Sequence, residues 1–349
     1  MATMLAAMLS LVVGVSSAPG WTGPSYFVYD SGAYAATFAA GHVYTAEPAP
    51  SGGYGPGSGP GVGYTSSAGT QFACCVPSQR YFFELSIAVH LVLGATWARI
   101  VWVDSNNRDA VWLSRNDTGQ WVTSRLWIGK AYTPSVANLG RGIAVAFEDS
   151  HGRLRYLTWD PVSGPSAPIT VSSDCCTGFS LAVNGGHPAI AFATRSYVLR
   201  LWTGGTTVTV AHNAESPSLA FAHGAPAIAY DSGGVWYAHR VGSTWHTARV
   251  LGLAYSEPSL AADASGRVAL VAAGANATRT WIAFKRLDVA SPTVTLMQAP
   301  YVGDAPESIP WDQPYVGLWG GKAVGTAFYA GRPATPGGGF PGPYVTRQL

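Results

Sequence analysis

The sequence predicts an all-β protein, a six-bladed β-propeller of four-stranded antiparallel blades, with seven blades as the alternative. Three observations indicate this class: a phrase that recurs every 38 to 49 residues, alternating apolar strands within each copy, and a high content of glycine and proline. A propeller blade takes about 40 to 50 residues, whereas a leucine-rich repeat takes about 20 to 29. The 349 residues include 42 glycines and 24 prolines, so every candidate helix is interrupted.

The repeats align on one serine in each copy. The five serines are Ser86, Ser135, Ser180, Ser218 and Ser259. The clearest copy reads PSLAFAHGAPAIAYDSGGVWYAHR from Pro217. It predicts strands over residues 218–221, 226–230, 235–240 and 245–251, with a turn at 231–234. Small residues fill the first two strands and bulky aromatic residues the third, as expected where inner strands crowd around an axis. We therefore expect the five serines on successive innermost strands.

The two ends of the chain are expected to share one blade. The last copy supplies two strands, at residues 314–319 and 323–330. Residues 27–34 echo the copy around Tyr230, and residues 42–47 then provide an outer strand. Sharing a blade closes the ring and leaves no unpaired edge at the junction. Residues 18–333 then form a single domain, with a Gly/Pro-rich insertion at 48–63 and a Pro/Gly-rich tail at 334–349.

The N-terminus reads MATMLAAMLSLVVGVSS, an apolar stretch that ends in small residues. This pattern is typical of a signal peptide over residues 1–17, so we expect a secreted, extracellular protein. A buried first strand or a misassigned start is the alternative. No other stretch is long and apolar enough to span a membrane.

The four cysteines form two adjacent pairs, Cys74 with Cys75 and Cys175 with Cys176. In an oxidising compartment they form disulfides, either between the two pairs or within each pair. A zinc site is disfavoured, because two sulfurs of adjacent residues reach one ion only awkwardly. No metal and no cofactor are therefore expected, and His239 and His246 are interpreted as residues that decorate strands.

Charge excludes one class of partner. There are 20 Lys+Arg against 18 Asp+Glu, and charged residues make up 11% of the chain. A protein that grips nucleic acid needs a basic excess to displace counterions from the phosphates. We expect no nucleic-acid partner, and the sequence leaves the oligomeric state open.

The repeat from Pro217 to Arg240 resembles the extracellular propeller repeats of the sialidase and BNR-type proteins, over residues 85–333. The resemblance implies a propeller fold and either sugar binding, as in related lectins, or sialidase-like hydrolysis. Sialidases of this kind use an arginine triad, a tyrosine nucleophile assisted by a glutamate, and an aspartate. The S-x-D-x-G-x-T-W box and the Arg-Ile-Pro segment are absent here. No catalytic residue is therefore assigned, and the balance is against an enzyme.

Binding residues are expected on one face of the ring. Chain direction alternates within a blade, so the loop into the first strand and the turn between the second and third strands share a face. Aromatic rings stack on sugars, and carboxylates accept hydrogen bonds from hydroxyl groups. The candidates on this face are Tyr132, Glu215, Tyr255, Glu257, Glu307, Trp311 and Asp312.

Three aspartates lie in the second-to-third turns of the same face, namely Asp104, Asp149 and Asp231. An Asp followed by Ser at a tight turn commonly binds its own backbone, which explains these residues without a ligand. The leading hypothesis is a propeller that binds glycans or a surface polymer through this face. A sialidase-like glycoside hydrolase or lyase, and a structural or filament-forming surface protein, are the alternatives.

Overall fold

The computed structural model describes thirty strands and most of their connections. The backbone is described for residues 16–17, 25–26, 35–39, 42–49, 61–66, 69–75, 82–92, 95–104, 110–117, 119–263, 265–276, 278–300, 311–319, 322–329 and 343–347. Side chains are described for residues 98–103, 110–117, 119–263, 265–276, 278–296, 316–318 and 322–323.

The described strands form seven antiparallel sheets, numbered here in chain order. Sheet 1 contains β3 (Ala35–Ala39), β4 (His42–Ala49), β5 (Gly61–Ser66) and β6 (Gly69–Cys75). Sheet 2 contains β7 (Phe82–Val92), β8 (Ala95–Asp104), β9 (Ala110–Asn116) and β10 (Trp121–Ile128). Sheet 3 contains β11 (Ala131–Leu139), β12 (Gly142–Asp149), β13 (Leu154–Asp160), β14 (Gly164–Pro165) and β15 (Ile169–Ser172).

The remaining sheets repeat this order, and the last two also take strands from the start of the chain. Sheet 4 contains β16 (Phe179–Asn184), β17 (His187–Ala193), β18 (Val198–Thr203) and β19 (Thr206–His212). Sheet 5 contains β20 (Glu215–Ala222), β21 (Ala225–Asp231), β22 (Val235–Val241) and β23 (Thr244–Arg249). Sheet 6 contains β24 (Tyr255–Ala262), β25 (Val268–Ala275), β26 (Arg279–Arg286), β27 (Val294–Pro300) and β1 (Ser16–Ser17). Sheet 7 contains β28 (Trp311–Trp319), β29 (Lys322–Tyr329), β30 (Pro343–Arg347) and β2 (Ser25–Tyr26).

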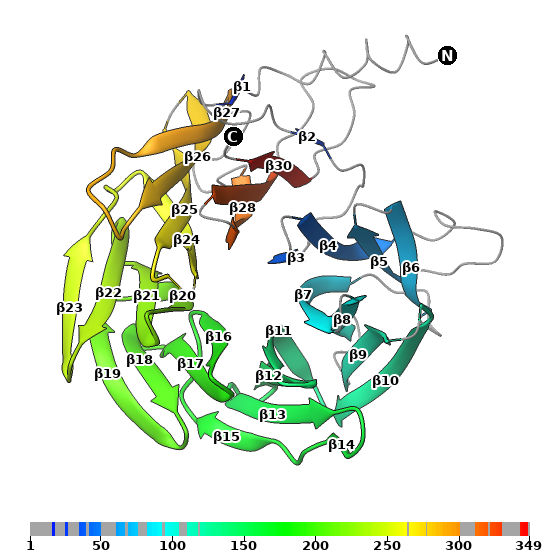
Figure 1. Ribbon diagram of the computed structural model, residues 1–349. Helices are drawn as coiled ribbons and strands as arrows, with labels where there is room; N and C mark the ends of the chain where they lie inside the picture. Colours follow the sequence, from blue (N-terminus) through cyan, green and yellow to red (C-terminus); the bar gives the residue numbers. More distant parts are fainter. Residues whose placement is uncertain are drawn as a thin grey trace, which may run out of the picture.

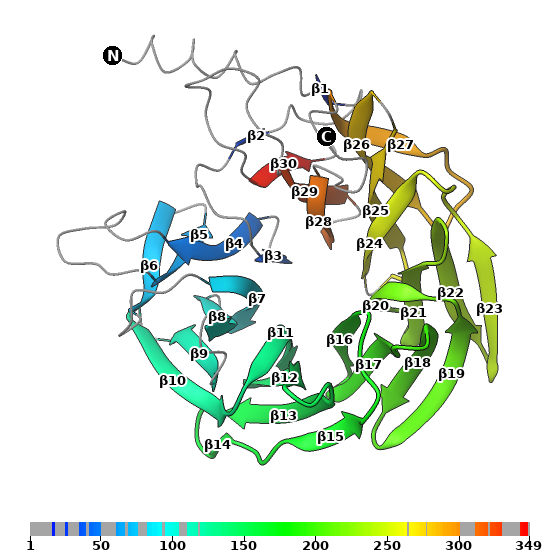
Figure 2. The same cartoon turned by 180° about the vertical axis from the view of Figure 1, so that it is seen from behind.

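The sheets are arranged radially, with the first strand of each nearest the centre (Figure 1) and the same order seen from behind (Figure 2). First strands of successive sheets contact one another: β3 with β7, β7 with β11, β11 with β16, β16 with β20, β20 with β24, β24 with β28, and β28 with β3. This radial packing of four-stranded antiparallel sheets is the architecture of a β-propeller. Within the described residues, no helix is long or apolar enough to cross a membrane.

The aligned serines connect neighbouring innermost strands. In four cases the hydroxyl accepts a hydrogen bond from a backbone N–H on the first strand of the next sheet. These bonds run from Leu181 to Ser135 at 3.3 Å, from Leu219 to Ser180 at 3.1 Å, from Leu260 to Ser218 at 2.9 Å and from Val316 to Ser259 at 3.2 Å. Ser86 lies on β7, the first strand of sheet 2. The prediction that these serines mark successive innermost strands is confirmed.

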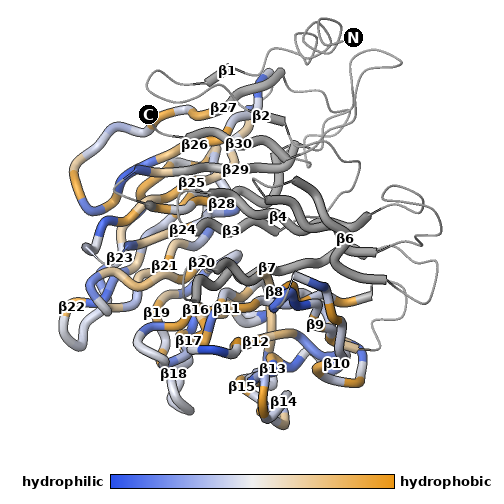
Figure 3. The backbone as a smooth tube through the Cα atoms, turned by 45° about the vertical axis from the view of Figure 1, so that its right-hand side comes forward, coloured by the Kyte–Doolittle hydropathy of each residue, from blue (hydrophilic) through white to orange (hydrophobic). Residues whose placement is uncertain are grey.

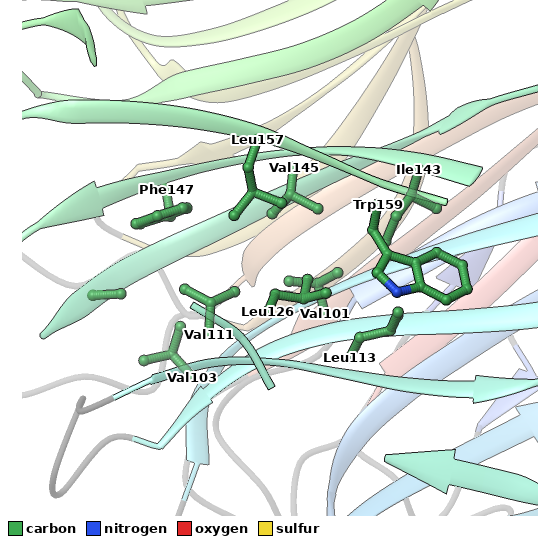
Figure 4. Close-up of a cluster of buried hydrophobic side chains, with 11 residues drawn as sticks. Val101, Val103, Val111, Leu113, Leu126, Ile143, Val145, Phe147, Leu157 and Trp159 are labelled. Atoms are coloured by element: carbon green, nitrogen blue, oxygen red, sulfur yellow. The ribbon is translucent and has the colours of Figure 1, made fainter. Parts of the chain in front are cut away.

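In the part of the chain whose side chains are described, neighbouring sheets enclose separate apolar cores, from the junction of sheets 2 and 3 to that of sheets 6 and 7. The second strands lie between two neighbours and are buried on both faces, which is why β12 reads GIAVAFED without alternation. Figure 4 shows the core between sheets 2 and 3, where Val101 and Leu113 meet Val145 and Trp159. Outer strands such as β19 and β23 are mostly exposed. Along the tube of Figure 3, hydrophobic segments lie within the sheets and hydrophilic segments recur at the turns.

The described strands form seven sheets, the number given above as the alternative to six. The reason lies in residues 35–75, which pair among themselves as four consecutive strands. His42–Ala49 is consequently the second strand of sheet 1 and not the outer strand of the last sheet, as the sequence pattern had indicated. Residues 27–34, expected in the last sheet, lie outside the described residues.

Sheet 7 does combine both ends of the chain, but in other proportions than expected. Among the described residues, three of its strands come from the C-terminal end, and the N-terminal end contributes β2, Ser25–Tyr26. The third strand, β30, falls within residues 334–349, which the sequence indicated as a tail. The last repeat appeared to lack strands because a Pro/Gly-rich stretch separates β30 from β29 in the sequence.

Candidate functional site

The face at which the first strands begin is called the upper face, and the opposite one the lower face. Tyr132, Glu215, Tyr255 and Glu257 lie at or near the starts of β11, β20 and β24, so the structure brings all four to the upper face. Trp311 and Asp312 begin β28 at the same face, although only their backbone is described. Glu307 lies outside the described residues.

A bulge recurs at the upper face where the first strand starts. The β-ladder register shifts between Tyr132 and Ser135, and equivalent shifts occur in sheets 5, 6 and 7. In three of these bulges the residue before a proline has positive φ: Thr133 at 42°, Ser216 at 45° and Glu257 at 50°. Residues other than glycine rarely adopt a positive φ, and a proline disfavours helical backbone angles in the residue before it. Bulges of this kind re-aim neighbouring side chains and are frequent beside functional sites.

Glu215 and Asp231 form a carboxylate pair at the upper face. They are register partners across β20 and β21, which places their Cβ atoms roughly 4.5 to 5.5 Å apart. Burial raises the pKa of Asp231, hydrogen bonds from the backbone of Gly234 and its neighbours oppose this shift, and the charge of Glu215 raises it again. No lysine, arginine or histidine in the described part of the chain forms an ion pair with either residue. Two acids thus face each other without a counter-ion.

Asp149 occupies the same turn position in sheet 3 and behaves differently. It is buried, and its carboxylate accepts hydrogen bonds from the backbone of His151 at 2.9 Å and of Arg153 at 3.2 Å, and from Arg153 Nε at 2.8 Å. Burial opposes its ionisation, but these hydrogen bonds outweigh burial and hold the pKa of Asp149 below its usual value. The interpretation of Asp149 as a backbone-binding turn residue is confirmed. Asp104 ends β8, and its side chain is not described.

The turn beneath Asp231 is fixed by glycine. Gly234 has a φ of 105°, and a Cβ there would lie 2.7 Å from the carbonyl oxygen of Gly252. Gly233 in the same turn has a φ of 60°, and a Cβ there would make an ordinary contact with Leu253 at 3.6 Å. The close approach of the Gly252 backbone therefore requires glycine at position 234, and it sets where Asp231 is held.

The two tyrosines of the upper face are partly committed to packing. Tyr255 is half-buried against the core between sheets 5 and 6, and its ring meets that of Trp281 edge-on at 5.8 Å. Tyr132 is half-buried opposite Glu148. Neither ring is a freely exposed stacking platform, and Glu215 is the most exposed of the described candidate side chains on this face.

The cysteine pairs lie on different parts of the ring. The sulfur atoms of Cys175 and Cys176 lie against each other, and Cys175 is buried in the core between sheets 3 and 4. Cys74 and Cys75 end β6, at the outer edge of sheet 1.

A cavity of about 540 Å³ opens on the lower face, where the sequence placed no candidate. Its polar rim comes from turns between first and second strands in sheets 4, 5 and 6, through Asn184, His223 and Asp263. Asn184 Nδ2 donates to the carbonyl of Gly224 at 3.1 Å, and the His223 ring covers Gly266 so closely that no side chain fits there. Two of the three rim groups therefore link neighbouring sheets.

Asp263 is likewise engaged within its own turn. It accepts hydrogen bonds from the Ser265 hydroxyl at 2.7 Å and from Arg267 Nε at 2.7 Å. The cavity was missed because its rim residues differ in type from copy to copy. The available signal was positional: a polar residue stands at the same turn in three consecutive repeats. No group of three or more His, Cys, Asp or Glu side chains in the described residues is placed to hold a metal ion.

Neither a family model nor the sequence of a curated protein matches this chain. Solved structures match it in fold. A mutant of AofleA from Arthrobotrys oligospora aligns at 12% identity with a TM-score of 0.52, over 80% of this chain and 92% of that one.

Two further alignments involve proteins with stated activities. A fungal lectin from Aleuria aurantia, described as a six-bladed β-propeller with a novel mode of fucose recognition, aligns at 12% identity with a TM-score of 0.48, over 81% of this chain and 99% of that one. Trypanosoma rangeli sialidase aligns at 10% identity with a TM-score of 0.48, over 94% of this chain and 60% of that one. At these identities the likeness concerns the fold and extends to no site.

Proposed function

We propose that the chain binds a glycan, or another polymer rich in hydroxyl groups, at its upper face. The observation that carries this proposal is the carboxylate pair of Glu215 and Asp231. Ionised carboxylates accept hydrogen bonds from the hydroxyl groups of sugars, and a protonated one also donates. The proposal rests on the chain's own residues, because the likeness to solved structures concerns the fold.

The pair is unusual among the acids of this protein. Asp149, Asp160, Asp263 and Asp288 each form an ion pair with an arginine of their own sheet. Glu215 and Asp231 repel each other and have no such partner among the described residues. Groups that destabilise the folded protein locally, such as two neighbouring acids without a counter-ion, are expected at functional sites. A ligand that donates hydrogen bonds to both acids would relieve the repulsion.

A glycan array tests this proposal. We expect the purified protein to bind a subset of glycans, and the Glu215→Gln/Asp231→Asn variant to bind them about 10- to 100-fold more weakly, as for lost hydrogen bonds to charged groups. Asp160→Asn is the matched control. It removes a carboxylate on the lower face, where Asp160 pairs with Arg141 at 2.7 Å, and should leave binding unchanged. Equal binding by the double variant and the parent, or no binding by the parent, contradicts the proposal.

Glycoside hydrolysis is a second candidate, favoured by the same pair. Most glycosidases use two carboxyl groups, of which one with a raised pKa protonates the leaving group. Asp231 has the raised pKa, and Glu215 stands opposite it. To separate the two candidates, the glycans that bind are incubated with the purified protein for a prolonged time and analysed by chromatography. Intact glycans support binding, and shortened glycans support hydrolysis.

We propose that the seven sheets are the blades of one closed propeller. The contact between β28 and β3 supports closure, since these strands belong to the last and first sheets. Pairing of β2 with β30 adds a second connection between the chain ends. A closed ring buries the faces of the first and last sheets that an open array of sheets would leave exposed.

We also propose that the protein is secreted, with residues 1–17 removed as a signal peptide and with Cys175 and Cys176 oxidised. Removal of residues 1–17 takes away β1, and sheet 6 keeps its four strands β24 to β27. Mass spectrometry of the non-reduced, secreted protein tests both points. We expect Ala18 at the N-terminus and Cys175 linked to Cys176 in one peptide; an intact N-terminus or free thiols at these positions contradicts them.

A further inference from the structure

A half-buried positive charge without a counter-ion lies on the third strand of sheet 4. Arg200 belongs to β18, and among the described residues no carboxylate forms an ion pair with it. Its Nε is buried and has no hydrogen-bond partner there. The guanidinium group has therefore lost part of its hydration without gaining a partner in the protein, which costs free energy.

Arg200 differs in this respect from the rest of the arginines whose side chains are described. Each of the others either forms an ion pair with a carboxylate or is exposed. Those that are exposed and have no ion pair are Arg125, Arg240, Arg249 and Arg279. Water compensates the charge of an exposed guanidinium group, so these four need no counter-ion. Arg200 is consequently the arginine whose surroundings favour an external one.

The side chain of Arg200 leaves sheet 4 on the side of sheet 3. Successive side chains of a strand point to opposite faces of its sheet. Leu199 and Leu201 pack in the core between sheets 4 and 5, whereas Trp202 packs in the core between sheets 3 and 4. Phe192, the register partner of Arg200 on β17, belongs to the same core as Trp202. Arg200 therefore stands at the junction of sheets 3 and 4.

The guanidinium group is accessible from the outer rim of this junction. Nη1 and Nη2 of Arg200 also have no partner among the described residues, but unlike Nε they are not buried. The fourth strands leave the rim open, because Thr209 on β19 is exposed and Ile169 on β15 is 49% exposed. A solute that comes from outside the ring thus reaches the two terminal nitrogens.

Hydroxyl groups of both sheets add hydrogen-bond donors near this charge. Thr209 is the register partner of Arg200, and such partners share one face of the sheet. Tyr156 of sheet 3 contacts Trp202, with ring centroids 5.2 Å apart. Neither hydroxyl has a hydrogen-bond partner in the described part of the chain. Burial raises the pKa of Tyr156, so its phenol keeps its proton at neutral pH.

We propose that Arg200 binds an oxyanion, a carboxylate or a sulfate group, end-on through Nη1 and Nη2 at the outer rim between sheets 3 and 4. The planar guanidinium group presents parallel N–H donors that match two oxygens of such a group. The Thr209 hydroxyl is an additional donor for a third oxygen. This site is separate from the carboxylates of the upper face and does not depend on what they bind.

Equilibrium dialysis of the full protein against radiolabelled sulfate, with the ionic strength held constant by NaCl, tests the site. We expect saturable binding of one sulfate per chain. Arg200→Gln keeps N–H donors but loses the charge, and it should weaken sulfate binding by more than about tenfold. Arg249→Gln is the matched control, because it removes an equal charge from an exposed position on β23 of sheet 5. It should bind sulfate as the parent does.

Arg200→Lys separates the shape of the guanidinium group from its charge. Lysine keeps the charge and loses the parallel donors, so its affinity should lie between those of the parent and Arg200→Gln. Equal sulfate binding by Arg200→Gln and the parent overturns the proposal, and so does the absence of saturable binding by the parent.

The melting temperature gives a second readout that does not rely on dialysis. Sulfate stabilises any folded protein by exclusion from its surface, and this effect is common to the parent and the variants. Sulfate bound at Arg200 adds to it, so the parent should gain more in melting temperature than Arg200→Gln. Equal gains in the two proteins contradict a bound ion.

The same variants identify the source of the oxyanion. Dextran sulfate and polygalacturonate carry sulfate and carboxylate groups on a polymer, and dextran is the neutral control. If the oxyanion belongs to a polymer, one of the first two should bind at least about tenfold more tightly per acidic group than free sulfate or acetate. If it is a free ion, the affinities per group should be equal. In both cases binding should be lost in Arg200→Gln, and its retention there overturns the proposal.

Discussion

At the scale of single residues, Asp149 and Asp231 show how one sequence pattern leads to two electrostatic outcomes. Both are followed by serine and both end a second strand. Arg153 follows Asp149 by four residues and binds it, whereas Val235 stands at the same distance from Asp231. The sequence alone predicted one role for both aspartates, and the missing arginine was the signal that separates them.

These surroundings predict opposite effects of removing each charge. The folded-state pKa of Asp231 is raised, so its ionised form destabilises the folded protein once pH is above that pKa. Asp231→Asn should therefore raise the melting temperature at pH 7, and the gain should disappear as pH falls through the pKa toward 3.8. The folded-state pKa of Asp149 is lowered, so its ionised form stabilises the protein above the unfolded value of 3.8.

Asp149→Asn should accordingly lower the free energy of unfolding by about 1.5 to 3 kcal/mol at pH 7, as for a lost hydrogen bond to a charged group. This loss should shrink as pH falls below 3.8, because the parent then loses the same charge. Melting curves of both variants between pH 3 and pH 7 provide the measurement. Shifts of the same sign at pH 7 contradict the assigned surroundings.

At the scale of elements, the serine that recurs in each sequence repeat connects one innermost strand to the next. Ser218 on β20 accepts the backbone N–H of Leu260 on β24 at 2.9 Å, and three other aligned serines do the same. Their regular spacing made the first strands predictable, because one hydroxyl is needed per sheet. The strands of residues 35–75 were harder to place, since that segment contains none of the aligned serines.

Ser218→Ala tests this connection. The change leaves the Leu260 N–H without its acceptor and should lower the free energy of unfolding by about 1 to 2 kcal/mol. For a protein of 349 residues, the corresponding fall in melting temperature is about 1 to 2 °C per kcal/mol. Ser232→Ala, which removes a hydroxyl without a hydrogen bond among the described residues, is the control. Equal melting temperatures of the two variants would show that the serine contributes nothing between sheets.

At the scale of the whole molecule, sequence periodicity predicted the radial arrangement and left the choice between six and seven sheets open. The period and the apolar second strands follow from local packing, which each copy repeats. The number of sheets depends on whether residues 35–75 join the last sheet or pair among themselves, and that segment contains none of the aligned serines. The upper face was predictable because strand direction alternates, whereas the lower cavity arises from three unlike turns.

A crystal structure of the protein with a glycan identified on the array tests the central claim most directly. The account predicts sugar hydroxyl oxygens about 2.5 to 3.0 Å from the carboxylates of Glu215 and Asp231 on the upper face. A glycan seated instead in the lower cavity beside Asn184 and His223, with both carboxylates in solvent, would contradict it.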